Sequence, residues 1–284
     1  MVRMLEMLDI RDGRRVLEIG TGTGYNAALL CHRLGDDRVF SVDIDPELIA
    51  LARQRLADAG FRPTVVAVDG ERGLPEHAPY DRIIATCAVP AVPASWTRQL
   101  APGGALLVDL KLAVSAGNLV HLHRKDNGTL EGRFAAKWGS FMTMRHNGEA
   151  GNPLPATHHT EAERSFGTSA PVPPWENRVM WFLAQLVGLP RDVVFGALLD
   201  EATRRPYAHT LTAPDGSWSR VDIADNTVTE GGTTSLWQPV ESAYRLWRDN
   251  DEPTWSRLGL TVDTEGVNTV WLDDPDGEHR WSIG

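Results

Sequence analysis

Cysteine is scarce in this sequence, which holds only Cys31 and Cys87 among its 284 residues. Two cysteines cannot build a disulfide framework or a four-ligand metal site between them, so we expect reduced thiols. The nine histidines include His158-His159 and His121-Leu122-His123, but neither cluster has the His-x-x-x-His spacing that puts two ligands on one helical face. We therefore expect no metal centre.

Long hydrophobic runs and an excess of basic charge are also lacking. No apolar run approaches the roughly 20 residues of a membrane-spanning helix, and Met1 to Arg14 alternates charged with apolar side chains instead of forming a signal peptide. The 28 Lys and Arg face 38 Asp and Glu, and the formal charge of −10 opposes binding to phosphate backbones and anionic membranes. We expect a cytoplasmic protein that binds neither nucleic acid nor membrane, with a monomer as the default state.

The first half of the chain alternates short apolar runs with helical patterns, which is typical of a parallel sheet wound with helices. One helix is expected over 25–34 and another from Pro46, which favours a first turn, to Gly60, which ends it. A hairpin turning at Asn127-Gly128 closes this part. We predict an α/β fold with a doubly wound, mostly parallel sheet. Its expected strands are 15–19, 39–43, 65–68, 82–85 and 105–110, followed by the hairpin strands 119–125 and 130 onward.

The composition changes in the second half. Residues 147–174 are rich in Gly, Pro, Thr and His with little periodicity, which indicates a linker or crossing loop. Tryptophans crowd the rest of the chain, where helical spacing over 179–186 and 240–247 accompanies alternating strands at 217–223 and 267–272. We predict a smaller α+β domain whose role concerns the substrate. Its aromatic residues are expected in its core, and the alternative is that exposed tryptophans grip a peptide. The predicted boundaries are 1–146, 147–174 and 175–284.

The strongest functional signal is the run Val16 to Tyr25, in which a strand enters a glycine loop that opens a helix. Glycines let a backbone approach a ligand closely, and the N-terminus of the helix adds unpaired N–H groups. The spacing Gly20-x-Gly22-x-Gly24 differs from the Gly-x-Gly-x-x-Gly of dinucleotide sites, and Glu18 precedes it. A carboxylate there suits a ligand with an ammonium or sulfonium group, which indicates S-adenosylmethionine.

Acidic residues follow the next two expected strands. Asp43 lies about 20 residues after the loop, where a carboxylate can accept both ribose hydroxyls, and we expect Asp45 to cap the helix at Pro46. Asp69-Gly70 follows the third strand, where an acid can meet the adenine amino group, although a simple Asp-Gly turn explains it equally well. Because open α/β sheets bind ligands at the carboxyl ends of their strands, three such ends predict one nucleoside site.

Further runs add a more specific signal: Ser41 to Pro46, Tyr80 to Pro90 and Leu100 to Gly104. With the glycine loop and Asp69-Gly70, they resemble protein-L-isoaspartate O-methyltransferases over roughly residues 1–145. The resemblance implies a class I, Rossmann-like methyltransferase that uses S-adenosylmethionine. It implies that the cofactor is held by Glu18, Gly20, Thr21, Gly22, Thr23, Gly24, Tyr25, Asp43, Ile44, Asp69 and Gly70. It implies that the substrate carboxylate pocket is lined by Thr86, Cys87, Ala88, Val89 and Pro90.

The residue inventory fits carboxyl methylation. A carboxylate with a pKa of about 4 is already ionised at neutral pH, so methyl transfer needs alignment and desolvation but no general base. The ester would then let the neighbouring backbone nitrogen close a succinimide, which water opens. We expect no nucleophilic role for Cys87, because no base partner is evident.

The Trp-rich second half lies outside the housekeeping repair enzyme of the family. It resembles the extra domain of actinobacterial relatives that methylate aspartate in ribosomally made peptides such as lanthipeptides. We therefore predict a methyltransferase acting on an aspartyl or isoaspartyl carboxylate of a peptide or protein, with maturation of a precursor peptide as the leading hypothesis. Repair of damaged proteins is the alternative within this class.

One departure from the family concerns the N-terminus. In the family, a serine-containing segment just upstream of a stretch similar to Met1 to Glu6 covers the cofactor and contacts the substrate carboxylate, and this sequence begins inside that stretch. Either the start site is placed too far downstream, or the chain lacks this lid and is a cofactor-binding module without activity. No catalytic residue is therefore assigned, and Lys111, Ser140 and Arg145 are candidates to replace the serine.

A methyltransferase acting on nucleic acid is the third hypothesis. The negative charge disfavours it. The run Ala85-Thr86-Cys87-Ala88 also disfavours it, because amino methyltransferases of DNA carry an Asn or Asp followed by two prolines at this place.

Overall fold

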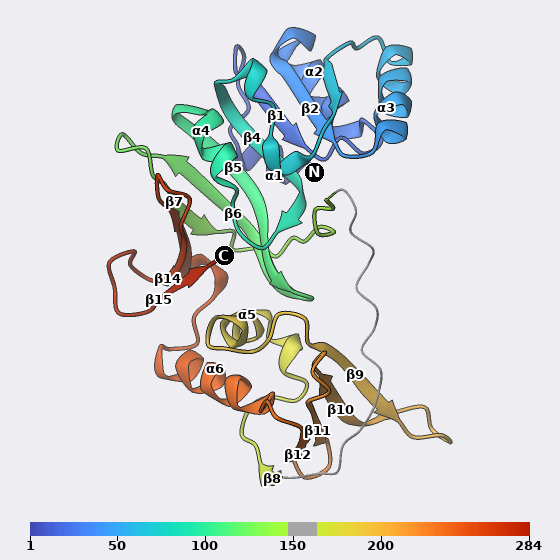
Figure 1. The fold of residues 1–284 in the computed structure, drawn as a ribbon, viewed down its shortest axis with the longest axis vertical. Helices are drawn as coiled ribbons and strands as arrows, with labels where there is room; N and C mark the ends of the chain where they lie inside the picture. The colour runs from blue at the N-terminus through green and yellow to red at the C-terminus, as the bar shows by residue number, and fades with distance from the viewer. Residues whose placement is uncertain (147–163) are drawn as a thin grey trace. The chain divides into compact units, whose positions relative to one another are not determined.

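The computed structural model describes residues 1–146 and 164–284, which belong to two compact units (Figure 1). Of these residues, the first unit contains Met1–Lys111, 118–146 and Trp255–Gly284. The second unit contains Leu112–Gly117 and 164–254. The chain therefore leaves the first unit and returns to it near the C-terminus.

A ten-stranded sheet forms the centre of the first unit, in the order β15-β14-β13-β7-β6-β5-β4-β1-β2-β3. The five strands β1 to β5 pair in parallel, whereas β7 pairs antiparallel with β6 and β13, and β14 pairs antiparallel with β13 and β15. The strands are β1 Val16–Ile19, β2 Val39–Asp43, β3 Thr64–Ala67, β4 Tyr80–Val89, β5 Leu100–Ala113, β6 Ala116–Arg124, β7 Leu130–Phe134, β13 Leu258–Val262, β14 Asn268–Leu272 and β15 Arg280–Ile283.

A side-chain cap fixes the start of the helix α3, Pro46–Asp58. Asp45 Oδ1 accepts hydrogen bonds from the N–H groups of Glu47 and Leu48, at 2.9 and 3.2 Å, directly before Pro46, so the predicted cap of this helix is confirmed. No helix in the described parts of the chain is long and apolar enough to cross a membrane. The helices are α1 Val2–Met7, α2 Tyr25–Leu34, α3 Pro46–Asp58 and α4 Ala94–Gln99.

The order of the parallel strands positions a ligand site. The chain runs from β1 outward to β2 and β3, then crosses to the other side of β1 for β4 and β5. Ile19 at the end of β1 is level with Val42 of β2 and Ala85 of β4. Connections that leave neighbouring strand ends in opposite directions open a crevice at the carboxyl edge of the sheet.

The predicted doubly wound α/β fold and its closing hairpin are confirmed, since β6 and β7 pair antiparallel on either side of the Asn127-Gly128 turn. One connection differs from a complete β/α unit. Between β3 and β4 the chain forms only short 3-10 turns at Gly70–Arg72 and Pro75–His77. These turns bring Asp69 and Gly70 to the carboxyl edge of the sheet without an intervening helix.

The second unit is built on a five-stranded antiparallel sheet in the order β8-β12-β11-β10-β9. Its helices α5 (Arg178–Leu186) and α6 (Trp237–Asp249) contact each other. Trp181 and Trp237 are fully buried, so these aromatic residues belong to the core. The strands are β8 Arg164–Gly167, β9 Val194–Leu199, β10 Pro206–Thr212, β11 Trp218–Asp222 and β12 Thr227–Gly231.

The structure divides the chain differently from the predicted boundaries at 146 and 174. Arg164–Gly167, in the expected linker, forms the edge strand β8 of the second sheet, and 147–163 lie outside the described residues. The last 30 residues, Trp255–Gly284, belong to the first unit, where β14 and β15 lie on the side of β7 (Figure 1). There β13 pairs with β7, and the centre of a Trp255 ring lies 5.5 Å from that of Phe134. The physical reason is that β7 would otherwise leave an unpaired sheet edge.

Candidate functional site

The glycine loop after β1 lies against the end of β4. Gly20 has φ +97°, and a Cβ atom built on it would lie 2.7 Å from Thr86 Oγ1. The Thr86 hydroxyl donates to Gly20 O at 2.7 Å, while the N–H groups of Gly20 and Thr21 donate to Val42 O of β2 at 2.8 and 3.0 Å. The conformation and the close approach both require glycine, so the loop is fixed between the ends of β2 and β4.

Glu18 lies behind this loop in a buried hydrogen-bond network. Asn26 Nδ2 donates to Glu18 Oε1 at 2.8 Å, and Ser41 Oγ donates to Glu18 Oε2 at 2.6 Å. The Ser41 oxygen lies 2.7 Å from Thr21 Oγ1, which can donate to it because the Ser41 proton is already used. The network therefore ties β1, β2, the loop and the first turn of α2 together.

Burial raises the pKa of Glu18 to about 7, and the hydrogen bonds from Ser41 and Asn26 oppose that shift. The side chain is 1% exposed and does not line the hollow described below. The sequence predicted Glu18 as a direct ligand, whereas its contacts make it a support for the backbone that faces the ligand.

Asp43 ends β2 and holds the loop from the other side. Its Oδ2 accepts the Gly22 N–H at 2.8 Å, and its Oδ1 accepts the Asp45 N–H at 3.2 Å. A Cβ atom on Gly22 would meet nothing within 4 Å, so the loop is open to a ligand at this point. The Asp43 carboxylate thus lies at a strand end, half-buried, with lone pairs left for hydroxyl groups.

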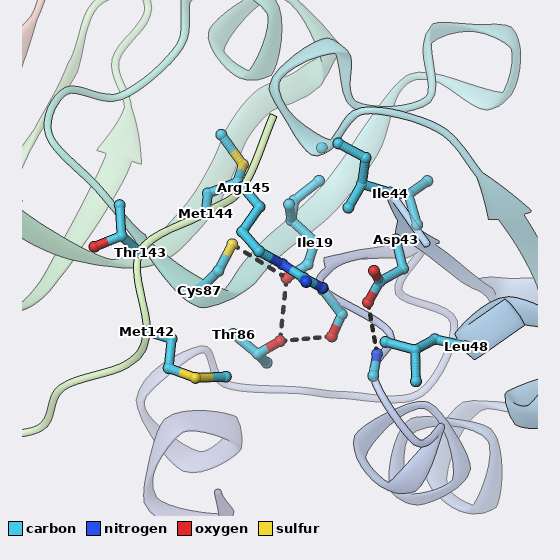
Figure 2. Close-up of a pocket in the computed structure, with 14 residues that line it drawn as sticks. Ile19, Asp43, Ile44, Leu48, Thr86, Cys87, Met142, Thr143, Met144 and Arg145 are labelled. Atoms are coloured by element: carbon cyan, nitrogen blue, oxygen red, sulfur yellow. Dashed lines mark hydrogen bonds between the residues drawn. The ribbon is translucent and has the colours of Figure 1, made fainter. Parts of the chain in front are cut away.

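These strand ends surround a hollow with a cavity volume of about 180 Å³ (Figure 2). It belongs wholly to the first unit. Beside the polar groups it has apolar walls from Ile19, Val42 and Leu48. The predicted site residues that line it are Gly20, Gly22, Asp43, Ile44, Gly70, Thr86 and Cys87.

The other predicted residues lie elsewhere. Thr21 is buried against Ser41, and Thr23, Gly24 and Tyr25 line a separate shallow hollow between α2 and α3. Ala88 and Val89 are buried in β4, and Pro90 is exposed beyond it. Five of the eleven residues predicted to hold the cofactor thus line the hollow, and the predicted substrate residues are divided among a pocket wall, a strand interior and the surface.

Sequence reasoning missed one wall, the segment Met142–Arg145. The Ala88 N–H donates to Met142 O and the Met144 N–H donates to Ala88 O, both at 2.8 Å, so the segment runs beside the end of β4. Figure 2 shows it crossing one side of the hollow. The run Phe141 to Met144 is too short to show a periodicity that would place it here.

Besides the hydrogen bonds of Ala88, a clamp formed by Asp109 and Lys111 holds the start of this wall. The Phe141 N–H donates to Asp109 Oδ2 at 2.7 Å, and Lys111 Nζ, 3.8 Å from that carboxylate, donates to Phe141 O. Burial raises the pKa of Asp109, while Phe141 N–H, Lys111 and Ser140 oppose the shift. Lys111 and Ser140, two of the three polar side chains singled out in the sequence, are therefore engaged by the wall and its clamp.

Asp69 lies at the far end of the hollow beside Gly70. Its Oδ1 accepts the Glu71 N–H at 2.9 Å, and its Oδ2 lies 3.1 Å from His146 Nδ1. Asp69, Glu71 and His146 offer ligand atoms within 4.8 Å of one another, which is a spacing that a metal ion could use. The hydrogen bond alone accounts for the approach of His146 to Asp69.

Cys87 lines the hollow as a neutral thiol. Burial, with smaller effects from the Asp43 and Asp109 carboxylates, raises its pKa to about 12. Its Sγ lies 3.9 Å from Ile19 O. A thiol that stays protonated at neutral pH is a poor nucleophile, which agrees with the expectation that Cys87 has no such role.

The hollow has the features of a nucleoside site: exposed loop backbone, a carboxylate at the end of β2, and apolar flanks from Ile44, Leu48 and Met144. The family model for protein-L-isoaspartate(D-aspartate) O-methyltransferase (PCMT) matches residues 1–144. This chain belongs to the PCMT family. The matched range contains every residue that lines the hollow except Arg145.

Individual relatives agree with this membership. The protein-L-isoaspartate O-methyltransferase of Methanococcoides burtonii is 43% identical over 129 residues, covering 42% of this chain and 64% of the relative. That of Thermococcus onnurineus is 40% identical over 157 residues, covering 55% and 66% respectively. This chain thus matches slightly less than two thirds of the length of either relative.

A solved structure of a protein-L-isoaspartate O-methyltransferase shares the fold. It aligns with a TM-score of 0.54 at 24% identity and covers 96% of this chain and 80% of its own. The alignment extends well beyond residues 1–144, so a second part is not peculiar to this chain.

Proposed function

We propose that this chain is an S-adenosylmethionine-dependent methyltransferase that esterifies an isoaspartyl or aspartyl carboxylate in a peptide or protein. The observation that carries the proposal is the hollow itself: 13 of its 14 lining residues fall within the range matched by the PCMT family. The strand ends, the glycine loop and the Met142–Met144 wall meet there.

The chain's own residues would hold the cofactor through three kinds of contact. Asp43 would accept the ribose hydroxyls, and the Gly20–Gly22 backbone would face the amino-acid end. Gly70 and Met144 would flank the base, since a Cβ on Gly70 would already lie 3.1 Å from Met144 Sδ. When bound, S-adenosylmethionine supplies an electrophilic methyl group on a sulfonium.

The remaining work of the site is alignment and exclusion of water. The acceptor carboxylate is ionised at neutral pH and needs no base. Thr86 is held to the loop by its hydroxyl, and the neutral Cys87 thiol adds no charge that would repel an anionic acceptor. The clamped wall covers one side of the hollow, so the acceptor would lose water as it enters.

We propose two alternatives for the acceptor of the methyl group. An isoaspartyl residue is favoured because the relatives that match this chain carry that name. Maturation of a ribosomally made peptide is the second proposal, supported by the abundance of tryptophan after residue 174. The alignment with the solved protein-L-isoaspartate O-methyltransferase covers 96% of this chain, including its second unit. The presence of a second unit therefore does not by itself distinguish tailoring from repair.

Intact mass spectrometry with S-adenosylmethionine tests the proposal directly. Three substrates are compared: an isoaspartyl peptide, the same sequence with aspartate, and a precursor peptide encoded beside the gene. A methyl group gained on the isoaspartyl peptide alone supports repair, whereas methylation or loss of water on the precursor supports tailoring.

The variant Asp43→Asn tests the cofactor site. It retains an oxygen for the Gly22 N–H but loses one acceptor for the ribose. We expect at least tenfold weaker binding of S-adenosylhomocysteine to this variant, because a charged acceptor becomes neutral. If the native chain binds S-adenosylhomocysteine but modifies no peptide, the proposed activity is wrong and the chain is a cofactor-binding module.

A further inference from the structure

Arg145 ends the wall of the hollow and points into it. Figure 2 shows its side chain extending from the wall across the hollow, with the guanidinium among the lining residues. The wall is fixed just before it, since the Met144 N–H donates to Ala88 O at 2.8 Å. Arg145 therefore reaches the hollow from a backbone whose position is set by β4.

The charges that line the hollow are few. Of the 14 lining residues, Asp43 is the one carboxylate and Arg145 the one cation, and burial keeps the Cys87 thiol neutral. Arg145 is exposed, and within the described parts of the chain no carboxylate lies within 4.0 Å of its guanidinium, whereas the half-buried Arg14 and Arg257 have such partners. A permanently charged group therefore faces the hollow without a protein anion beside it.

The chemistry of guanidinium limits what this group would recognise. Its planar array of N–H donors matches a carboxylate in two parallel hydrogen bonds, and it has no acceptor for a ligand hydroxyl or amino group. Asp43 supplies the opposite chemistry and accepts from hydroxyls. The two residues therefore select a ligand set that brings hydroxyl donors to one place and a carboxylate to another.

We propose that Arg145 is the carboxylate-recognition residue of this site. The inference rests on the proposed function, which places two carboxylates near this wall: that of the methionine part of the cofactor and that of the acceptor side chain. Both offer the same chemistry to Arg145. Of the three polar side chains singled out in the sequence beside this site, Lys111 and Ser140 are engaged around Asp109 and Phe141, whereas Arg145 faces the ligand space.

The test compares Arg145→Met and Arg145→Lys with Arg98→Met, an exposed arginine of α4 away from the hollow. Calorimetry measures the affinity for S-adenosylhomocysteine and for 5′-methylthioadenosine, which keeps the thioadenosine but has no carboxylate. Steady-state methylation of an isoaspartyl peptide gives KM and kcat separately. Thermal melting shows that each variant is folded.

If Arg145 binds the cofactor carboxylate, Arg145→Met weakens S-adenosylhomocysteine at least tenfold and leaves methylthioadenosine unchanged. If it binds the acceptor, S-adenosylhomocysteine is unchanged, and the KM for the peptide rises at least tenfold with a smaller change in kcat. In either case Arg145→Lys retains part of the affinity, because the charge remains but the paired geometry is lost.

The inference is wrong if Arg145→Met behaves like Arg98→Met in both assays. Failure of the proposed function gives a different result, in which the native chain binds S-adenosylhomocysteine but methylates no peptide. In that case calorimetry with the isoaspartyl peptide replaces KM, and the role of Arg145 is overturned if Arg145→Met binds both S-adenosylhomocysteine and the peptide as tightly as the native chain.

Discussion

At the scale of single residues, Glu18 shows how the site is supported from behind. Its carboxylate accepts hydrogen bonds from Ser41 and Asn26 and does not line the hollow. Its position before a glycine loop was visible in the sequence, but its burial was not, because burial depends on how α2 and β2 pack around β1. The sequence could therefore identify Glu18 but not the side chains that donate hydrogen bonds to its carboxylate.

The raised pKa of Glu18 predicts a pH-dependent stability. With a pKa of about 7 in the folded chain and 4.5 in the unfolded chain, Glu18 favours the folded state most below pH 4.5, and this contribution is lost as the pH rises through 7. Glu18→Gln removes the titration, and the Asn26 amide can turn its unpartnered Oδ1 to accept from the glutamine.

Urea unfolding of both proteins between pH 5 and 8 measures this effect. We expect the native chain to lose roughly 2–3 kcal/mol relative to Glu18→Gln over that range. Parallel stability curves for the two proteins would contradict the assignment, because titration of other groups is common to both.

Gly20 gives a second prediction at this scale. Gly20→Ala places a Cβ atom 2.7 Å from Thr86 Oγ1 at φ +97°, whereas Gly13→Ala has a similar φ of +82° with nothing within 4 Å. Both variants should lose about 1–2 kcal/mol to the left-handed backbone. Only Gly20→Ala should also bind S-adenosylhomocysteine at least tenfold more weakly by calorimetry, because the loop must shift. Equal affinities in the two variants would mean that the contact with Thr86 does not shape the site.

At the scale of elements, the Met142–Arg145 wall is held by two strands that are far from it in the sequence. Ala88 of β4 bonds to Met142 and Met144, and Asp109 and Lys111 of β5 bond to Phe141. Periodicity correctly predicted the parallel strands, α2, α3 and the hairpin, because those patterns are local. It could not predict the wall, because only the folded sheet brings its partners together.

The clamp on this wall can be tested through Lys111. Lys111→Met removes the donor to Phe141 O and leaves the fully buried Asp109 without its nearest cation. We expect a stability loss of roughly 2–3 kcal/mol and faster hydrogen exchange at the Phe141 and Met144 amides, which donate to Asp109 and Ala88. Mass spectrometry after deuterium labelling measures the exchange.

Lys125→Met is the matched control, since Lys125 makes an ion pair with Glu131 at 3.0 Å on the half-exposed hairpin. It should change the stability by less than about 1 kcal/mol and leave the exchange of the wall unaltered. If Lys111→Met also leaves the exchange unaltered, the contact of Lys111 with Phe141 does not hold the wall.

At the scale of the whole molecule, the first unit is built from two separate stretches of chain. The strands at 217–223 and 267–272 look alike in sequence, yet β11 joins the second sheet and β14 the first. Alternation reveals a strand but not its neighbour, because pairing between distant strands is set by register and packing. For this reason the two-part organisation was predictable and the return of Trp255–Gly284 was not.

This arrangement predicts that residues 1–146 are insufficient for a stable first unit. A chain ending at His146 exposes the edge of β7 and loses the contact between Phe134 and Trp255, so we expect it to aggregate or melt at a lower temperature. Trp255→Ala in the full chain removes the same contact without truncating the chain. It should lower the free energy of unfolding by roughly 3–5 kcal/mol. Unchanged melting of both proteins would show that β13–β15 are dispensable.

The return of the chain to its first sheet also orders events on the ribosome. The hairpin strand β7 emerges early, but its partner β13 emerges only after the residues from Phe134 to Trp255 have been translated, which takes roughly 6–24 s at about 5–20 residues per second. During that interval the inserted second unit can fold, while the nascent first unit still carries an open sheet edge. Chaperone protection during synthesis should therefore matter most in this window, and it should end when the last three strands leave the exit tunnel.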